Sequence, residues 1–439
     1  MKIRDLLDVD YSLLFSAAVL SVFGILFIYS SGINSEGVNV SNEYVRQIIW
    51  ASMGFAAALA LAFINYRRLY NVSLYLYIAV LALLVYTMFF GRTINGARSW
   101  LGIGPVGIQP SEFAKIITIV FLARYLDGSR KNENQLLRFI IACIIVLIPM
   151  GLILLQPDFG TSLVFIPILL VTTFVSRMKL QYIAFLFFCI VFGGALLVLP
   201  IWQEYILGNT IPALDILESS RFVAIAVGGL VLITLIAILG FLRLQKRYFY
   251  WIFYVSTILI ISLGVSFVGR SVLAEYQIMR LIVFLDPNVD PRGAGWNIIQ
   301  SVTAIGSGGL WGKGYLEGTQ SHYQYLPQQS TDFIFSIFSE EWGFVGGLLV
   351  FVLFLIICLR LIRVMRTSSD LFGQDIAAGI SGMFIFHFLI NVGMTMGIMP
   401  ITGIPLLFMS YGGSAMLTAW AGIGLALSIF MRRHIRSER

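Results

Sequence analysis

The chain has 439 residues, of which 59% are hydrophobic and 12% are charged, and its formal net charge is +7. Soluble domains carry about 25% charged residues, and disordered chains combine low hydrophobicity with high charge, so the composition excludes both classes. The mean hydropathy is +0.89, and apolar runs of about 20 residues recur along the chain. These features predict an all-α, polytopic helical membrane protein. An outer-membrane barrel would instead show alternating strands of about ten residues.

The apolar runs predict about twelve transmembrane helices in a single integral membrane domain that covers residues 1–439. The predicted spans are 11–31, 45–64, 72–90, 111–126, 136–155, 160–176, 180–201, 222–242, 248–269, 333–359, 376–398 and 403–431. The first run is too long for a signal peptide and lacks an A-x-A cleavage site, so we expect it to remain in the protein.

The distribution of basic residues predicts the orientation of the spans. If the N-terminus is cytoplasmic and loops alternate, 20 of the 29 Lys and Arg residues fall on the cytoplasmic side, as the positive-inside rule requires. Both termini are therefore predicted to be cytoplasmic, and a large loop, 270–332, is predicted to lie outside. The net basic charge is interpreted as contact with anionic lipid of the inner leaflet, and it gives no support to nucleic-acid binding.

Polar residues open three of the predicted spans at the outer face. The segment Gln109–Lys115 opens the fourth span, Gln156–Thr161 the sixth and Ser330–Phe333 the tenth. The predicted topology places all three helix N-termini at one face, where they would favour a phosphate or pyrophosphate group. Asp158, and Glu112 if it is considered alone, are most simply explained as residues that cap or complement a helix start.

Lys115 does not fit a capping role. A cation in the first turn opposes the helix dipole, and an ammonium group below the headgroups costs about 2.5–3.5 kcal/mol. Lys115 therefore needs an acidic partner, for which Glu112, Asp158 and Asp332 are available. We expect a direct pair between Lys115 and Asp332, within about 4 Å. Ionisable residues inside a membrane indicate a functional site.

Other features have ordinary structural interpretations. The glycine-rich segment (Gly306–Gly314) is not a P-loop, because Ser307 and Gly314 replace the required Gly and Ser/Thr, and a tight bend is the simpler interpretation. His387 and Asn391 lie four residues apart on one helix face, which predicts interhelical hydrogen bonds. The three cysteines and three histidines show no spacing typical of disulfide frameworks or metal sites.

These segments resemble the SEDS family (shape, elongation, division and sporulation). The resemblance covers nearly the whole chain in order, through Asn95–Trp100, Gln109–Lys115, Gln156–Thr161, the stretch from Leu285 through Gly343, and Ser410–Ser414. Within the family, Gly306–Gly309 and Gly318–Ser321 are similar to the RodA branch rather than the FtsW branch.

The resemblance implies a peptidoglycan glycosyltransferase that acts at the outer face of the bacterial cytoplasmic membrane during cell elongation. Its substrate would be lipid II, a disaccharide-pentapeptide on undecaprenyl pyrophosphate. Its partners would be a class B penicillin-binding protein and other membrane proteins of the elongation machinery. The family's essential acid matches Asp332, and its lysine and neighbouring acid match Lys115 and Glu112. Family members usually have ten spans, so a count of twelve implies an extra pair within 180–246.

The hypothesis for the mechanism makes Asp332 the general base for an attacking sugar hydroxyl. Lys115 would position Asp332 or neutralise phosphate, and Arg46 and Arg98 are candidate pyrophosphate clamps, with interfacial snorkelling as an equal alternative. The other polar residues assigned to substrate binding are Gln109, Ser111, Asp158 and Lys313. A divalent cation, Mg²⁺ or Mn²⁺, is compatible with the acids as ligands, but the sequence requires no metal or other cofactor.

The competing function is a flippase for the same lipid. A carrier needs a polar path through the membrane midplane and often shows internal repeats. Here the ionisable residues cluster at the predicted outer face, which favours an enzyme. A purely structural scaffold would leave Lys115 and Asp332 unexplained.

Overall fold

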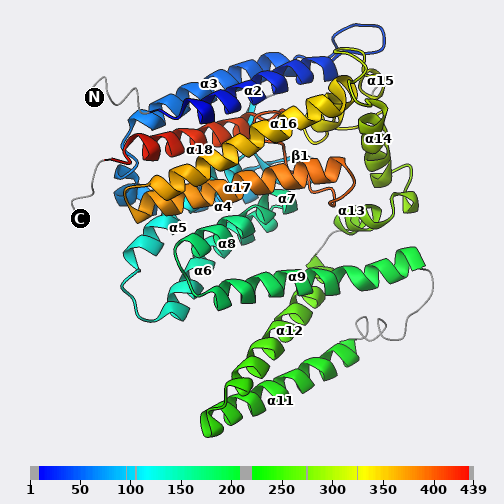
Figure 1. The fold of residues 1–439 in the computed structure, drawn as a ribbon. Helices are drawn as coiled ribbons and strands as arrows, with labels where there is room; N and C mark the ends of the chain where they lie inside the picture. The colour runs from blue at the N-terminus through cyan, green and yellow to red at the C-terminus, as the bar shows by residue number, and fades with distance from the viewer. Residues whose placement is uncertain are drawn as a thin grey trace. The chain divides into compact units, whose positions relative to one another are not determined.

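The computed structural model describes residues 9–94, 96–103, 106–207, 220–272, 275–323 and 325–434. Within these ranges the protein is helical, with one small sheet (Figure 1). The chain divides into two units, the first formed by 1–178 and 297–439 and the second by 179–296. The single membrane domain inferred from the sequence remains a prediction.

The first unit contains the candidate site. Its helices are α2 (Tyr11–Ser31), α3 (Glu43–Phe63), α4 (Arg68–Phe90), α5 (Pro110–Gly128), α6 (Gln135–Leu154), α7 (Phe159–Leu163), α8 (Phe165–Val175), most of α14 (Ala294–Ser307), α15 (Thr319–His322), α16 (Ile334–Thr367), α17 (Leu371–Thr395) and α18 (Gly413–Met431). Helix α18 packs along α3, α16 packs against α2 and α17, and α17 packs against α5 and α8 (Figure 1).

Ten helices of the described residues are long and apolar enough to cross a membrane: α2, α3, α4, α6, α9, α11, α12, α16, α17 and α18. The multi-pass helical class is thus confirmed, but the count of twelve is not. The two remaining predicted spans fall on α5 and on Phe159–Val175, which is apolar but shorter. Helix α5 carries Glu112, Lys115, Arg124 and Asp127, so composition alone does not establish it as a span.

The core of the first unit is built around α18 and its close contact with α3. The buried ring of Trp420 lies against Gly54 and meets Phe55 and Phe408 edge-on, with ring centroids 5.3 and 5.5 Å away. Gly424 lies against the main chain of Ala58. Small residues at such crossings let helix backbones approach closely, which drives association where apolar lipid provides no hydrophobic force.

The segment between α4 and α5, which falls between two predicted spans, contains a three-stranded antiparallel sheet. Strand β1 (Arg92–Ile94) pairs with β2 (Ala97–Ile103), which pairs with β3 (Val106–Ile108). Gly96 precedes β2 with φ +84°, a left-handed conformation that glycine adopts without strain. Asn95, part of the family-like motif, lies outside the described residues. The described residues are therefore helical with one small β-sheet, rather than all-α.

Helix α16 is broken at Gly343, which has φ 63° and ψ −161°. The glycine-rich segment closes on this break. The N–H of Lys313 donates to the carbonyl of Glu340 over 3.1 Å, and the N–H of Phe344 donates to the carbonyl of Gly309 over 2.9 Å. These bonds pair main-chain groups that the break releases from the helix, which is how irregular backbone is tolerated inside membrane proteins. The interpretation of the segment as a tight bend is confirmed.

Replacement of Gly343 by alanine is expected to destabilise the protein. The backbone angles of Gly343 are nearly exclusive to glycine and cost other residues about 1–3 kcal/mol, and a Cβ atom would also overlap the main-chain nitrogen of Gly312. The matched control is Gly347→Ala on the same helix, where the nearest atom to a new Cβ is 3.7 Å away. The thermal melting temperature in detergent should fall for Gly343→Ala and hold or rise for Gly347→Ala, since alanine favours helix by about 1 kcal/mol. Equal melting temperatures would contradict the described break.

The second unit contains a three-helix arrangement. Its elements are α9 (Leu180–Trp202), the π-helical turn η1 (Gln203–Leu207), α11 (Ser220–Leu244), α12 (Arg247–Val272), α13 (Glu275–Leu285) and the short 3₁₀ turn η2 (Pro287–Val289). Helix α12 packs against both α9 and α11. The Tyr254 hydroxyl donates to the Gln181 carbonyl over 2.7 Å. The predicted extra pair within 180–246 falls on α9 and α11, and residues 208–219 between them lie outside the described residues.

The predicted large loop, 270–332, is partly helical. Helix α12 extends into it to Val272, and it contains α13, η2, α14 and α15. Its final residues lead directly into α16, so the loop positions the residues that precede that helix.

Candidate active site

Gln109 joins the starts of three helices at the candidate site. It precedes α5 in an extended conformation, and Pro110 occupies the first helical position, where the missing N–H has no helical partner to lose. The main-chain N–H of Gln109 donates to Ser414 Oγ in the first turn of α18 over 2.8 Å. Its side-chain Nε2 donates to Asp158 Oδ2 over 2.6 Å. The starts of α5, α7 and α18 are therefore held together by one residue.

Lys115 is completely buried and makes two polar contacts. Its Nζ lies 2.7 Å from Glu112 Oε1 and 3.1 Å from His387 Nε2. The expected direct pair with Asp332 is wrong: Glu112 takes this place among the described residues. The physical reason is local, because side chains three residues apart on a helix are neighbours. A pair formed within one helix turn needs no alignment of separate helices.

Two residues of α17 connect Lys115 to the segment that carries Asp332. His387 Nδ1 lies 3.0 Å from the Pro405 carbonyl oxygen. One turn later, Asn391 Nδ2 donates to the carbonyl oxygens of Ile404 and Asp332 over 2.8 and 3.0 Å. The predicted interhelical hydrogen bond is confirmed for His387, which reaches Lys115 on α5, whereas Asn391 bonds carbonyl groups of non-helical segments. These contacts also give the two residues a place in the candidate site that their spacing alone does not reveal.

Asp332 lies two residues before α16 begins. Its main-chain N–H donates to the Gln328 carbonyl over 3.0 Å, and its own carbonyl accepts from Asn391. Its side chain is half-buried. The main chain of Asp332 is thus bound to α17 through Asn391.

Asp158 has the capping role that its position predicts. Its Oδ1 accepts from the main-chain N–H of Thr161 over 3.2 Å at the start of α7. Burial raises the pKa of the Asp158 carboxyl above its usual range, and the nearby charge of Glu112 adds to this, while Thr161 and Lys115 act in the opposite direction. Asp158 therefore lies within the electrostatic reach of the Glu112–Lys115 pair.

Two buried polar atoms at the start of α5 have no hydrogen-bond partner in the described part of the chain. They are Ser111 Oγ and Glu112 Oε2. An unpaired buried polar atom costs about 1–3 kcal/mol, so such atoms mark places where a further polar group is favourable. Both residues were assigned to the site from the sequence.

The candidate pyrophosphate clamps are exposed. Arg46 lies on α3 and Arg98 on β2, where Arg98 Nε donates to the Gly91 carbonyl over 3.1 Å. Gln47, next to Arg46, is not among the residues that the sequence assigns to the site. It is buried, and its Nε2 donates to the Ser410 carbonyl over 2.9 Å, which connects α3 to the residues before α18. The sequence feature that indicates Gln47 is a polar amide side chain within the otherwise apolar span 45–64.

Lys313 makes structural contacts away from Glu112 and Lys115. Its Nζ lies 2.7 Å from Glu340 Oε1 and 2.6 Å from Thr319 Oγ1. Glu340 is buried and also accepts from the N–H groups of Thr319 and Gln320 over 2.9 and 3.0 Å. The ammonium of Lys313 thus fastens its loop to α16, and its assignment to substrate binding stays a prediction.

The last predicted span, 403–431, starts later than expected. Residues 400–412 are not helical, and α18 begins at Gly413. Pro405 lacks an N–H for a helix, and Gly403 has φ +71°. The segment is apolar enough to resemble a helical span, but its backbone is irregular. Its free carbonyl groups accept hydrogen bonds from His387 and Asn391.

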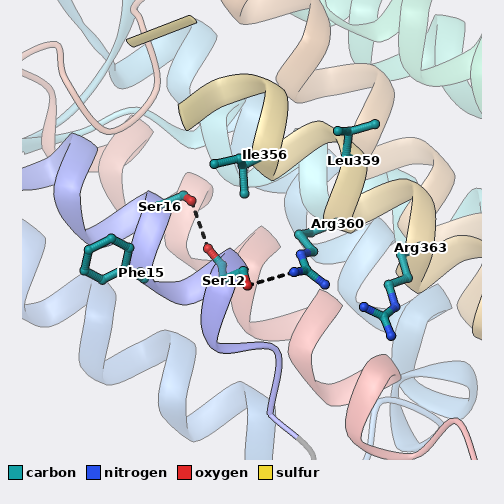
Figure 2. A pocket seen from close by; sticks show the side chains of 7 residues that line it. All are labelled: Ser12, Phe15, Ser16, Ile356, Leu359, Arg360 and Arg363. Atoms are coloured by element: carbon teal, nitrogen blue, oxygen red, sulfur yellow. Dashed lines mark hydrogen bonds between the residues drawn. The ribbon is translucent and has the colours of Figure 1, made fainter. Parts of the chain in front are cut away.

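Neither a metal cluster nor the groove between α2 and α16 coincides with the site. Within the described ranges, no three His, Cys, Asp or Glu side chains form a group that could hold a metal ion. A groove of about 560 Å³ lies between α2 and α16, lined by Ser12, Phe15, Ser16, Ile356, Leu359, Arg360 and Arg363 (Figure 2). These positions lie at helix ends predicted to be cytoplasmic, and the groove contains none of the candidate site residues.

The fold and the site define a multi-pass helical membrane protein with a buried Glu–Lys–His cluster at the start of one of its helices. The model of the FtsW, RodA and SpoVE family, described as cell cycle protein, matches residues 11–224 and 224–435. The chain belongs to this family, and the resemblance seen in the sequence is confirmed.

Relatives and solved structures extend this finding. The chain is 50% identical to peptidoglycan glycosyltransferase RodA of Treponema pallidum, over 99% of this chain and 100% of that protein. It is 31% identical to peptidoglycan glycosyltransferase MrdB of Escherichia coli K12, over 99% and 96%. A solved structure described as a peptidoglycan synthase complex that coordinates polymerisation and crosslinking matches with a TM-score of 0.68 and 26% identity, over 97% of this chain and 99% of that one.

Proposed function

We propose that the chain is a peptidoglycan glycosyltransferase that polymerises lipid II into glycan strands during cell elongation, with lipid II as both donor and acceptor. The observation that carries this proposal is the buried Glu112–Lys115 pair, which α17 connects to the main chain of Asp332. The activity named for the relatives from Treponema pallidum and Escherichia coli agrees with it.

Asp332 acts as the general base in this proposal. It takes the proton of the attacking sugar 4-hydroxyl as the new C–O bond forms at the anomeric carbon. The bond to the lipid pyrophosphate breaks, and its electron pair leaves with the pyrophosphate oxygen. A single displacement inverts the anomeric centre, so an α-linked donor gives a β-linked glycan, by analogy with inverting glycosidases. The half-buried carboxylate of Asp332 fits a group that must meet a substrate hydroxyl.

The leaving pyrophosphate requires positive charge, which Lys115 supplies only in part because Glu112 neutralises it. The exposed guanidinium groups of Arg46 and Arg98 have the geometry to bind phosphate oxygens with two hydrogen bonds. Gln109 and Ser111 add polar contacts at the start of α5, and Asp158 orients Gln109. Whether Mg²⁺ or Mn²⁺ also participates is decided by comparing polymerisation with and without a chelator.

The partner and the location follow the same proposal. A class B penicillin-binding protein would crosslink the strands, in agreement with the synthase complex that the chain resembles. We place the chain in the bacterial cytoplasmic membrane among other elongation proteins, with its site at the outer face and no role in nucleic-acid binding.

Polymerisation from purified lipid II tests the function directly. The full chain and its penicillin-binding partner should convert lipid II to glycan strands while penicillin blocks crosslinking. Transfer of lipid II across a vesicle membrane without any glycan product would instead support the flippase.

Cysteine labelling tests the predicted topology. The native Cys143, Cys189 and Cys358 are free thiols and are first replaced by alanine. We expect a membrane-impermeant maleimide added to intact cells to label Glu36→Cys, in a predicted outer loop, and not Asn132→Cys, in a predicted cytoplasmic loop. Both positions are exposed, so access to the compartment alone decides the result. The reverse pattern would place the candidate site at the cytoplasmic face and refute the proposal.

A further inference from the structure

The imidazole of His387 has a fixed protonation pattern in this fold. The ring is completely buried, with Nδ1 3.0 Å from the Pro405 carbonyl oxygen and Nε2 3.1 Å from Lys115 Nζ. A carbonyl oxygen only accepts hydrogen bonds, so Nδ1 carries the proton. An ammonium group only donates, so Nε2 accepts. These contacts assign His387 the neutral Nδ1–H tautomer, with Nε2 accepting from the Lys115 ammonium.

This contact gives Lys115 a second acceptor on a different helix. An ammonium group has three donors, and Glu112 on the same helix accepts one of them. The contact with Glu112 holds the ammonium against α5 but does not connect it to another helix. The hydrogen bond to His387 on α17 adds this connection and fixes the ammonium between α5 and α17.

The same helix also fixes Asp332. Asn391 lies one turn after His387 and donates to the main-chain carbonyl of Asp332 over 3.0 Å. Two adjacent turns of α17 therefore hold the ammonium of Lys115 and the backbone of Asp332. A neutral buried imidazole has one donor and one acceptor to pair, and here the Pro405 carbonyl pairs the donor while the Lys115 ammonium pairs the acceptor.

We propose that His387 is a positioning residue for polymerisation, which holds the Lys115 ammonium in place relative to Asp332. This inference rests on the proposed function of Lys115 and Asp332. It predicts that the residue required at position 387 is one that accepts from Lys115 and donates to the Pro405 carbonyl. Glutamine meets both requirements with its amide oxygen and nitrogen. Leucine meets neither.

The test compares His387→Gln and His387→Leu in the full-length enzyme with its partner. We expect His387→Leu to lower turnover at saturating lipid II by 10-fold or more, because a misplacement of about 1 Å can cost on the order of 10²-fold. The KM for lipid II should change little, and His387→Gln should keep most of the turnover. The matched control is Ser381→Ala, which removes a buried hydroxyl of the same helix that bonds only the Ala377 carbonyl, and it should stay within twofold of wild type.

Melting temperature and turnover per folded molecule separate positioning from a structural role. If His387 only supported the fold, the leucine variant would melt earlier while its folded fraction kept wild-type turnover, and that result would overturn the inference. Equal loss of turnover in the Gln and Leu variants would also overturn it.

Lys115→Met is measured in parallel. Full turnover of Lys115→Met would refute the proposed role of Lys115, and the inference with it, whereas loss in Lys115→Met with wild-type turnover in His387→Leu would refute only the inference. Absence of glycan synthesis by the wild-type protein with its partner would refute the proposed function itself.

Discussion

The Asp332→Asn variant is expected to lose glycan polymerisation by a factor on the order of 10²–10⁴, the usual contribution of a general base. Asparagine keeps the size of the side chain but cannot take a proton from the attacking hydroxyl. The hydrogen bonds that the main chain of Asp332 makes with Gln328 and Asn391 do not involve the carboxylate, so we expect them to persist in the variant, and its melting temperature checks the fold. Turnover of purified lipid II by the variant and its partner is the measurement.

The control for Asp332→Asn is Glu317→Gln, which removes one negative charge from the same long loop at an exposed position. It should retain wild-type polymerisation, since it changes the net charge equally without touching the candidate site. Wild-type glycan synthesis by correctly folded Asp332→Asn would remove Asp332 from the mechanism. Loss of activity in both variants would point to the charge of the loop and would also count against a general base.

The local part of the site could be predicted from the sequence. Glu112 and Lys115 are three residues apart in a helix, so their contact follows from helix geometry. The capping role of Asp158 follows from its place before a helical run. The need of a buried ammonium for an acid follows from the cost of charge in a membrane. Each of these inferences depends on residues within one or two turns of each other.

The long-range part could not be predicted. Helix spacing predicts the contact of Lys115 with Glu112, but it does not show which residues of other helices approach Lys115 or Asp332. The 272 residues that separate Lys115 from His387 leave no pattern that joins them. The apolar residues before α18 also concealed irregular backbone, because composition reports burial and not hydrogen bonding. The break at Gly343 was hidden in the same way.

The buried Glu112–Lys115 pair provides a second large effect, this time on stability. We expect Lys115→Met and Glu112→Leu each to lower the free energy of unfolding by about 3–5 kcal/mol, because removal of one partner leaves an uncompensated buried charge. The double variant should recover most of this loss, since replacing a buried ion pair by apolar residues of similar volume is often neutral or stabilising. All three variants should fail to polymerise lipid II if the ammonium is needed for the reaction.

Arg67 and Asp370 supply a matched control for the single replacement Lys115→Met. Their ion pair has the same kind of geometry, 2.8 Å between Arg67 Nε and Asp370 Oδ2, but the two side chains are 23% and 17% exposed. Water can therefore compensate a missing partner, and Arg67→Met should cost only about 1 kcal/mol or less. Chemical denaturation in detergent compares the stabilities, and the lipid II assay compares the activities.

A stable double variant that still polymerises lipid II would show that the Glu112–Lys115 pair serves folding alone. A double variant as unstable as either single variant would instead mean that the site needs the pair's remaining contacts, such as the hydrogen bond from Lys115 to His387, to stay folded.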